Sequence, residues 1–176
     1  MRVNQIPEEG KEVALKVDVK KANKYFSLLK NSDFSATSDV EGKVRVWSKD
    51  GMVIVEGEVS VELDLTCSRC LTHFRYPVYH HFRSIYSPFH EMCKVEDLEL
   101  KPYDMDVSIY NGIDLDLDNV LFEQVFLGMP AQVLCRPDCK GLCPVCGVNL
   151  NLETCQCDAP LPDTPFTVLK KLKLKG

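Results

Sequence analysis

The nine cysteines of this 176-residue chain constrain its fold more than any other feature, because eight of them fall in closely spaced pairs. The pairs are Cys67 and Cys70, Cys135 and Cys139, Cys143 and Cys146, and Cys155 and Cys157. A C-x-x-C turn places two thiolates on the same side of a tight loop, and four thiolates form the tetrahedral shell that Zn²⁺ prefers. The spacing therefore predicts metal ligation, with zinc as the cofactor.

Disulfide bonds are the alternative use of so many cysteines. They are typical of small secreted chains, in which the cysteines pair completely. Here the count is odd, since Cys93 is left over, and the first ten residues lack the apolar stretch of a secretion signal. We therefore expect a cytoplasmic protein with metal-bound thiolates. An iron–sulfur cluster is a minor alternative, because it also takes four cysteines.

The partition of the ligands between metals stays open at this level. The two pairs nearest the C-terminus can close one site locally, since only residues 147–154 separate them. Cys135 and Cys139 would then share a second metal with Cys67 and Cys70. A single metal held by Cys143, Cys146 and two other tail cysteines is the other arrangement. Full thiolate shells leave no open coordination position, so either arrangement predicts a structural site rather than a catalytic or redox site.

Alternation of apolar and polar residues predicts antiparallel β structure in the first two-thirds of the chain. From Val53 to Leu65 the odd positions are apolar, apart from one glycine, and the even positions from Glu56 to Asp64 are polar. Asp50-Gly51 before this run predicts a hairpin with the preceding residues. A further strand is expected at residues 13–19. Another is expected after Cys70, and Pro77 would place it at a sheet edge or bulge.

Helices are expected in three places. A short helix is predicted near residues 24–30, and a second near 116–128, with Asp114 or Asp116 as its N-cap. The acidic stretch before the second helix contains a short alternating run around residues 105–109, which predicts another strand. A basic helix is expected at the C-terminus, where a proline follows a capping residue.

These elements predict an α+β fold, mainly antiparallel β, with a few helices and a cysteine-rich metal-binding tail. Apolar residues make up 45% of the chain, which is enough for a hydrophobic core. We predict three regions: a β-rich domain over residues 1–130, a cysteine-rich zinc module over 131–160, and the basic helix over 161–176.

One stretch combines basic and aromatic side chains without any acid, from Leu65 to His90. Such a combination suits phosphate contact and base stacking. An ordinary solvated strand face is the alternative. The formal net charge of −5 gives no overall basic field, so any RNA contact would be local. The candidate RNA contacts are Arg69, His73, Arg75, Tyr79, His81 and Arg83.

Catalytic motifs are absent from the sequence. There is no glycine-rich phosphate loop, no G-x-S-x-G and no H-E-x-x-H. His80 and His81 are adjacent in a predicted strand, so they point to opposite faces and do not form one site. No segment approaches the ~20 apolar residues that a membrane span needs. We therefore expect neither an enzyme nor a membrane protein.

Four segments together resemble the YceD-like family of bacterial and plastid proteins, which is associated with accumulation of large-subunit ribosomal RNA. The longest is D-C-K-G-L-C-P-V-C-G-V-N-L at residues 138–150. The others are L-T-C-S-R-C-L at 65–71, C-Q-C at 155–157 and P-F-T-V-L-K-K-L at 165–172. The resemblance covers about residue 53 to the end, while the first fifty residues carry no recognisable motif.

The resemblance implies a role in ribosome biogenesis. Together with the cysteine pairs it predicts a non-enzymatic zinc-binding protein that acts in accumulation or processing of large-subunit (23S) ribosomal RNA. Its expected partners are ribosomal RNA or a precursor of the large subunit, or a ribosomal protein. Two other classes stay open. A metal-dependent rRNA-processing enzyme would cleave a precursor RNA with Mg²⁺, and a thiol-based redox or metal sensor would release its metal on oxidation.

Overall fold

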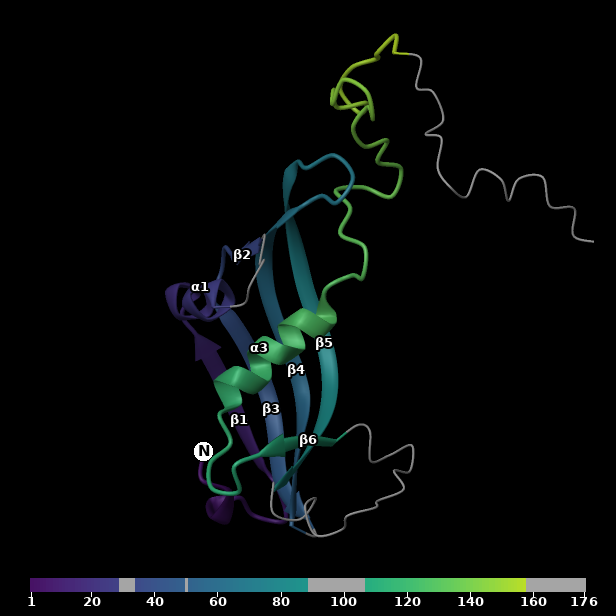
Figure 1. Cartoon of the computed structure of the whole chain (residues 1–176). Helices are drawn as coiled ribbons and strands as arrows, with labels where there is room; N and C mark the ends of the chain where they lie inside the picture. The colour runs from purple at the N-terminus through teal and green to yellow at the C-terminus, as the bar shows by residue number, and fades with distance from the viewer. Residues whose placement is uncertain (29–33, 50, 89–106, 158–176) are drawn as a thin grey trace, which may run out of the picture.

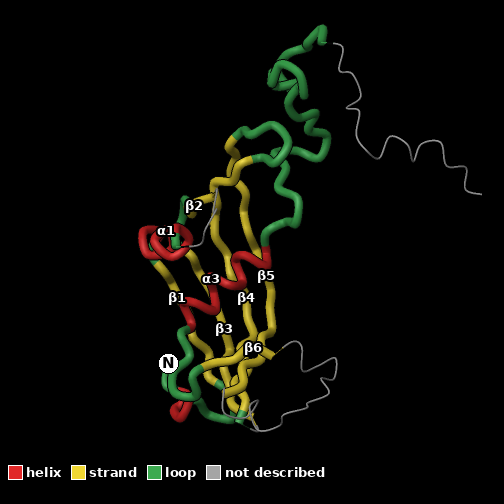
Figure 2. The backbone as a smooth tube through the Cα atoms, in the orientation of Figure 1, coloured by secondary structure: helices red, strands yellow, loops and turns green. Residues whose placement is uncertain are grey.

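The computed structural model describes residues 1–28, 34–49, 51–88 and 107–157. These form one sheet with strand order β1-β3-β4-β5-β6, and β2 pairs with the end of β4 (Figure 1, Figure 2). Among these described strands, only the β5–β6 pair is parallel. The elements are β1 (Lys11–Val17), β2 (Phe34–Ala36), β3 (Val40–Lys49), β4 (Met52–Thr66), β5 (His73–Pro88), β6 (Val107–Tyr110), α1 (Val19–Ser27), α3 (Leu117–Gly128) and a 3-10 turn, η1 (Val3–Gln5). This confirms the predicted fold class.

The long alternating run is β4, the central strand of the sheet. Its odd residues from Val53 to Leu65 are buried, apart from the half-buried Gly57. β4 pairs with β3 through the predicted hairpin and with β5 along nearly its whole length. Among the described residues β5 meets β6 only from Ile85 to Pro88, so Pro77 lies on a free strand edge. An edge is where the missing N–H of proline disrupts no ladder.

The two α-helices cover one face of the sheet, and α3 crosses it obliquely (Figure 1). Of the two predicted caps, Asp116 is the one used: its carboxylate accepts a hydrogen bond from the backbone N–H of Asp118 at 3.1 Å. A Cβ at Gly42 of β3 would lie 2.6 Å from Leu121 Cδ2. The glycine therefore lets α3 approach the sheet closely.

Aromatic rings join the two helices to β2. Phe26 of α1 and Phe122 of α3 are both almost completely buried, and their ring centroids lie 5.5 Å apart. Tyr25 lies 4.5 Å from Phe122, and Phe34 lies 5.3 Å from Phe126. This cluster fills the space between the helices and the end of the sheet.

The first fifty residues, which carry no family motif, supply half of the strands that the structure describes. The strand predicted at 13–19 is β1, and the helix predicted near 24–30 is α1, which begins earlier, at Val19. The earlier start has a local cause, because the Asp18 carboxylate accepts from the Lys20 N–H at 2.8 Å and caps the helix. Helix α1 then buries Ala22 and Phe26.

Some predictions fall outside the described residues. These are the C-terminal helix, the role of Cys93 and the first part of the acidic stretch, up to residue 106, whereas β6 lies in its described second part. The division into three regions stays a prediction. Within the described part of the chain, neither α-helix is long and apolar enough to cross a bilayer.

Candidate metal centre

The eight paired cysteines gather into two groups of four. In each group every pair of Sγ atoms lies within 4.8 Å. We call them the sheet tetrad, formed by Cys67, Cys70, Cys135 and Cys139, and the tail tetrad, formed by Cys143, Cys146, Cys155 and Cys157. Of the two arrangements that the sequence left open, the sulfur positions correspond to two sites of four.

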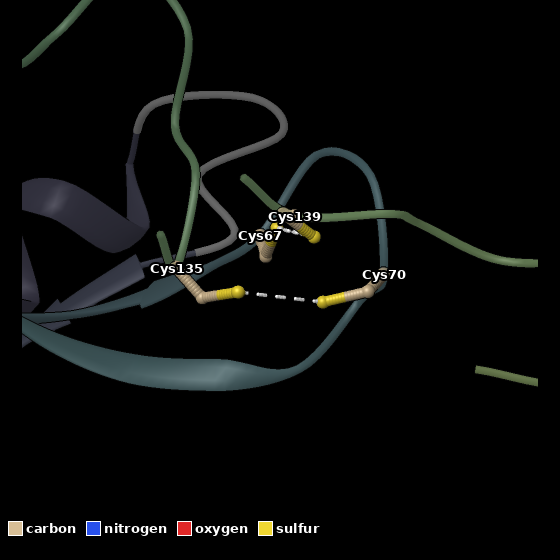
Figure 3. A group of neighbouring side chains, drawn as sticks. All are labelled: Cys67, Cys70, Cys135 and Cys139. Carbon is tan, nitrogen blue, oxygen red and sulfur yellow. Dashed lines mark hydrogen bonds between the residues drawn. The ribbon is translucent and has the colours of Figure 1, made fainter. Parts of the chain in front are cut away.

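The first half of the sheet tetrad comes from the turn that joins β4 to β5. The N–H of Leu71 donates to the carbonyl of Cys67 at 2.9 Å, and the N–H of Cys67 donates to the carbonyl of Thr72 at 3.0 Å. Leu71 closes the turn with a φ of 57°, which costs a non-glycine residue about 1–2 kcal/mol. The turn points the sulfurs of Cys67 and Cys70 to the same side (Figure 3).

The tail tetrad begins with the same turn. The N–H of Gly147 donates to the carbonyl of Cys143 at 2.9 Å, and the N–H of Cys143 donates to that of Val148 at 2.8 Å. Gly147 takes the left-handed conformation with a φ of 75°, without the strain of a side chain. The chain therefore builds one turn geometry twice, and each copy presents two sulfurs.

Hydrogen bonds dock the tail on the β4–β5 turn and bring in the second half of the sheet tetrad. The N–H and hydroxyl of Ser68 both donate to the Val133 carbonyl at 2.9 Å. The Arg69 guanidinium donates to the carbonyl of Cys139 at 3.1 Å, and the Arg69 carbonyl accepts from the N–H of Leu142 at 3.2 Å. Arg69, predicted from the sequence as an RNA contact, thus holds the segment with Cys135 and Cys139 in place.

The geometry of the sheet tetrad fits a tetrahedral metal. Cys67 Sγ lies 3.8 Å from Cys139 Sγ, and Cys70 Sγ lies 3.7 Å from Cys135 Sγ (Figure 3). With metal–sulfur bonds of about 2.3 Å, a tetrahedral zinc shell has sulfur–sulfur edges of about 3.8 Å. A disulfide would need about 2.05 Å. Cys67, Cys70 and Cys139 are also buried, so the site is closed to solvent on most sides.

The acidities of the thiols point the same way. Burial opposes ionisation of Cys67, but backbone N–H groups of Cys135, Cys70 and Arg69 donate to its sulfur and lower its pKa to about 6. Burial and the neighbouring thiols, that of Cys70 first, raise the pKa of Cys135 to about 12. One thiolate therefore forms readily, while four together require a cation to offset their repulsion.

The tail tetrad repeats this pattern in a more open setting. Backbone N–H groups of Cys146 and Val145 lower the pKa of Cys143 to about 6. The hydrogen-bonded thiol of Cys146, followed by burial, raises the pKa of Cys157 to about 12. Cys143 is buried, whereas Cys146 is exposed, so this site depends more on its own short loop than on the core.

The remaining candidate RNA contacts lie together on β5. His73, Arg75, Tyr79, His81 and Arg83 are all exposed on the sheet face opposite the helices, which we call the outer face. They form one row, because side chains alternate across a strand.

Residues 65–90 contain no acidic side chain, but acidic side chains of the neighbouring strand lie beside them in the sheet. Strand β4 lines the same face with carboxylates, and the cross-strand pairs include Glu56 with Arg83, Glu58 with His81, and Asp64 with Arg75. The Tyr79 hydroxyl donates to Glu58 at 2.6 Å. The outer face therefore carries both charge signs side by side rather than a basic strip.

Trp47 of β3 is half-buried, and the sequence did not identify it as a candidate contact residue. Arg45 and Arg83 approach its ring at 5.7 and 6.0 Å from the centroid. The neighbouring groove, about 890 Å³ in volume, includes Glu12, Arg45, Glu56 and Arg83 in its lining. The alternation of residues 44–47 with the buried Val44 and Val46 is the sequence signal that could have placed Arg45 and Trp47 on the same face of the strand.

Comparison with known proteins supports the resemblance seen in the sequence. The family described as large ribosomal RNA subunit accumulation protein YceD matches residues 55–173, which contain both tetrads. An uncharacterized protein of Mycobacterium tuberculosis is 32% identical over 110 residues, which cover 62% of this chain and 51% of the relative. The uncharacterized protein YlbN of Bacillus subtilis is 28% identical over 144 residues, which cover 81% of this chain and 76% of YlbN.

The chain spans about half the length of the mycobacterial relatives that it matches. No solved structure matches it. The family and these relatives give no sign of an enzymatic activity. Because the family match extends over most of the chain and includes all eight paired cysteines, this protein belongs to the YceD family.

Proposed function

We propose that this protein is a non-enzymatic, zinc-stapled factor that supports the accumulation of large-subunit (23S) ribosomal RNA in the cytoplasm. The observation that carries the proposal is the pair of complete thiolate tetrads in a chain of this family. Four thiolates fill a tetrahedral shell, so no coordination position is left for substrate or activated water. The metals would hold the tail to the sheet, and the folded surface would contact RNA or a precursor particle.

The donor set favours zinc. Thiolates are soft ligands that select zinc or iron–sulfur clusters over magnesium, calcium or manganese. The sulfur positions of the sheet tetrad suit a single ion with edges near 3.8 Å. A zinc ion also undergoes no redox change, which suits a structural staple.

Protein purified without oxygen is expected to contain two zinc ions per chain, one for each tetrad. Elemental analysis and native mass spectrometry would measure the stoichiometry, and thiol alkylation before and after chelation would show whether the cysteines are the ligands. Detection of iron together with visible absorbance would indicate an iron–sulfur cluster in place of zinc. A metal-free chain with disulfide-linked cysteines would contradict the proposal.

For the RNA contact we propose the β5 row on the outer face. Support comes from its exposure, in particular that of Tyr79, whose side chain is 61% exposed and available for base stacking. Arg75 and Arg83 supply the positive charge, while Arg69 is engaged with the tail. The carboxylates of β4 repel a phosphate backbone, so the affinity for RNA should be modest. Recognition should then depend on the shape of the RNA.

Two double variants test this surface, and they should change the RNA affinity in opposite directions. Arg75→Glu with Arg83→Glu should weaken binding to large-subunit RNA by roughly tenfold or more, because two phosphate contacts are lost. Glu56→Gln with Asp64→Asn should strengthen it, since two charges that repel phosphate are removed. Filter binding at several salt concentrations is the measurement, with an expected slope no steeper than about −2 for two phosphate contacts.

Circular dichroism controls for folding in both variants. If both bind RNA like the parent chain, the outer face is not the contact surface. If the parent binds no RNA but associates with precursor particles, a ribosomal protein becomes the direct partner. In that case the acidic stretch from Glu96 to Asp118 is the next candidate to alter.

A further inference from the structure

The loop that connects the two halves of the tail tetrad, residues 147–154, returns to the sheet tetrad. Its Asn151 side chain is the point of contact. The Asn151 amide nitrogen donates to Cys139 Sγ at 3.4 Å. The amide oxygen accepts from the backbone N–H of Lys140 and from the Arg136 guanidinium, both at 2.8 Å. One side chain thus touches a sulfur of the sheet tetrad, the backbone N–H of the next residue and the Arg136 side chain.

Asn149, in the same loop, reaches the other half of the sheet tetrad. Its amide nitrogen donates to Thr72 Oγ1 at 3.3 Å, and Thr72 Oγ1 lies 3.4 Å from Cys70 Sγ. The two asparagines are joined, because the Asn149 amide oxygen accepts from the side chain of Asn151 at 2.8 Å and from its backbone N–H at 3.0 Å. The pair therefore links Cys70 and Cys139 through one hydrogen-bonded network.

The backbone brings this loop close to the sheet tetrad. The Leu150 N–H donates to the Gly141 carbonyl at 2.9 Å, and Leu142 bridges to Asn149. Gly141 has a φ of 77°, and a Cβ there would lie 3.1 Å from the Arg69 carbonyl. The contact between the two metal sites is therefore built from backbone as well as from the asparagine side chains.

We propose that Asn149 and Asn151 are positioning residues that couple the two tetrads, so that metal in one tetrad raises the metal affinity of the other. The proposal rests on the proposed binding of metal at both tetrads. Metal in the tail tetrad fixes the loop that carries the asparagines, which holds the Asn151 N–H on Cys139 Sγ. An N–H donor to a ligating sulfur offsets its charge and orients it, as outer-shell partners do in metal sites. Coupling of this kind is reciprocal.

Titration of the full apo chain with ¹¹³Cd²⁺ tests the coupling, because NMR gives each tetrad its own resonance. In the parent chain, occupation of one tetrad is expected to raise the affinity of the other by roughly tenfold. Combining Asn149→Ala with Asn151→Ala should abolish this cooperativity. Leu152→Ala is the matched control, since its side chain is 81% exposed in the same loop. It should leave the cooperativity unchanged.

A second variant separates positioning from folding. Asn151→Asp keeps an oxygen that accepts from Lys140 and Arg136 but loses the amide nitrogen that donates to Cys139 and to the Asn149 amide oxygen. It should shift the sheet-tetrad resonance and lower the cooperativity while leaving the circular dichroism spectrum unchanged.

The outcomes separate this inference from the proposed function. Two ions that bind independently in the parent chain would overturn the coupling alone. The same holds if Asn151→Asp leaves both resonances and the cooperativity as they are. A parent chain that binds no cadmium would overturn both the coupling and the proposed metal binding.

Discussion

Replacing Cys67 by serine should open two parts of the molecule at once: the β4–β5 turn and the tail segment that follows α3. Cys67 is fully buried and lies 3.8 Å from Cys139 across the sheet tetrad. Structural zinc contributes roughly 10–16 kcal/mol to small zinc-dependent modules, so losing one of four thiolates should cost several kcal/mol locally. The cost falls on both segments because each supplies two of the ligands.

Hydrogen exchange by mass spectrometry measures this effect. The turn at residues 67–72 and the tail from 131 to 142 should both lose protection in Cys67→Ser, while the centre of the sheet keeps it. Cys146→Ser is the matched control, because it removes an exposed ligand of the tail tetrad. Its loss of protection should be largest in residues 143–157. Unchanged exchange in residues 131–142 of Cys67→Ser would contradict the shared site.

Phe122→Ala should be the most destabilising single change in the hydrophobic core, at about 3–5 kcal/mol. Phe122 is 1% exposed, and its ring lies 4.5 Å from that of Tyr25 and 5.5 Å from that of Phe26. Its removal leaves a cavity where α1, α3 and the sheet meet. The surrounding rings cannot collapse into that cavity without moving a helix.

Urea unfolding followed by circular dichroism measures the loss, with Leu127→Ala as the control on the same helix. Leu127 is 69% exposed, so its truncation should change the free energy of unfolding by no more than about 0.5 kcal/mol. Equal effects of the two substitutions would mean that α3 does not pack on α1 as described.

Local patterns were sufficient for much of the fold. The alternation from Val53 to Leu65 predicts β4 because one buried face imposes a period of two, whatever the neighbouring strands are. The Asp116 cap and the position of α3 follow in the same way from adjacent residues. The sequence pattern predicts helix α1 too late in the chain, because its cap, Asp18, lies before the residues that carry the apolar pattern.

The outer face illustrates where such reasoning ends. A window without acids along the chain predicts a basic strip only if nothing else lies beside it. Pairing with β4 brings Glu56, Glu58 and Asp64 next to the basic residues of β5. Strand register is a tertiary property, so the charge of a sheet face depends on both strands.

The sequence by itself determined that this chain offers thiolates in pairs, since two cysteines in one tight turn are close whatever the rest of the chain does. Only the tertiary structure decided which pairs meet. Cys67 and Cys139 are 72 positions apart, and they come together because the β4–β5 turn hydrogen-bonds to the segment that leaves α3. Contacts over that separation depend on how the sheet and α3 pack, and no local spacing encodes that packing.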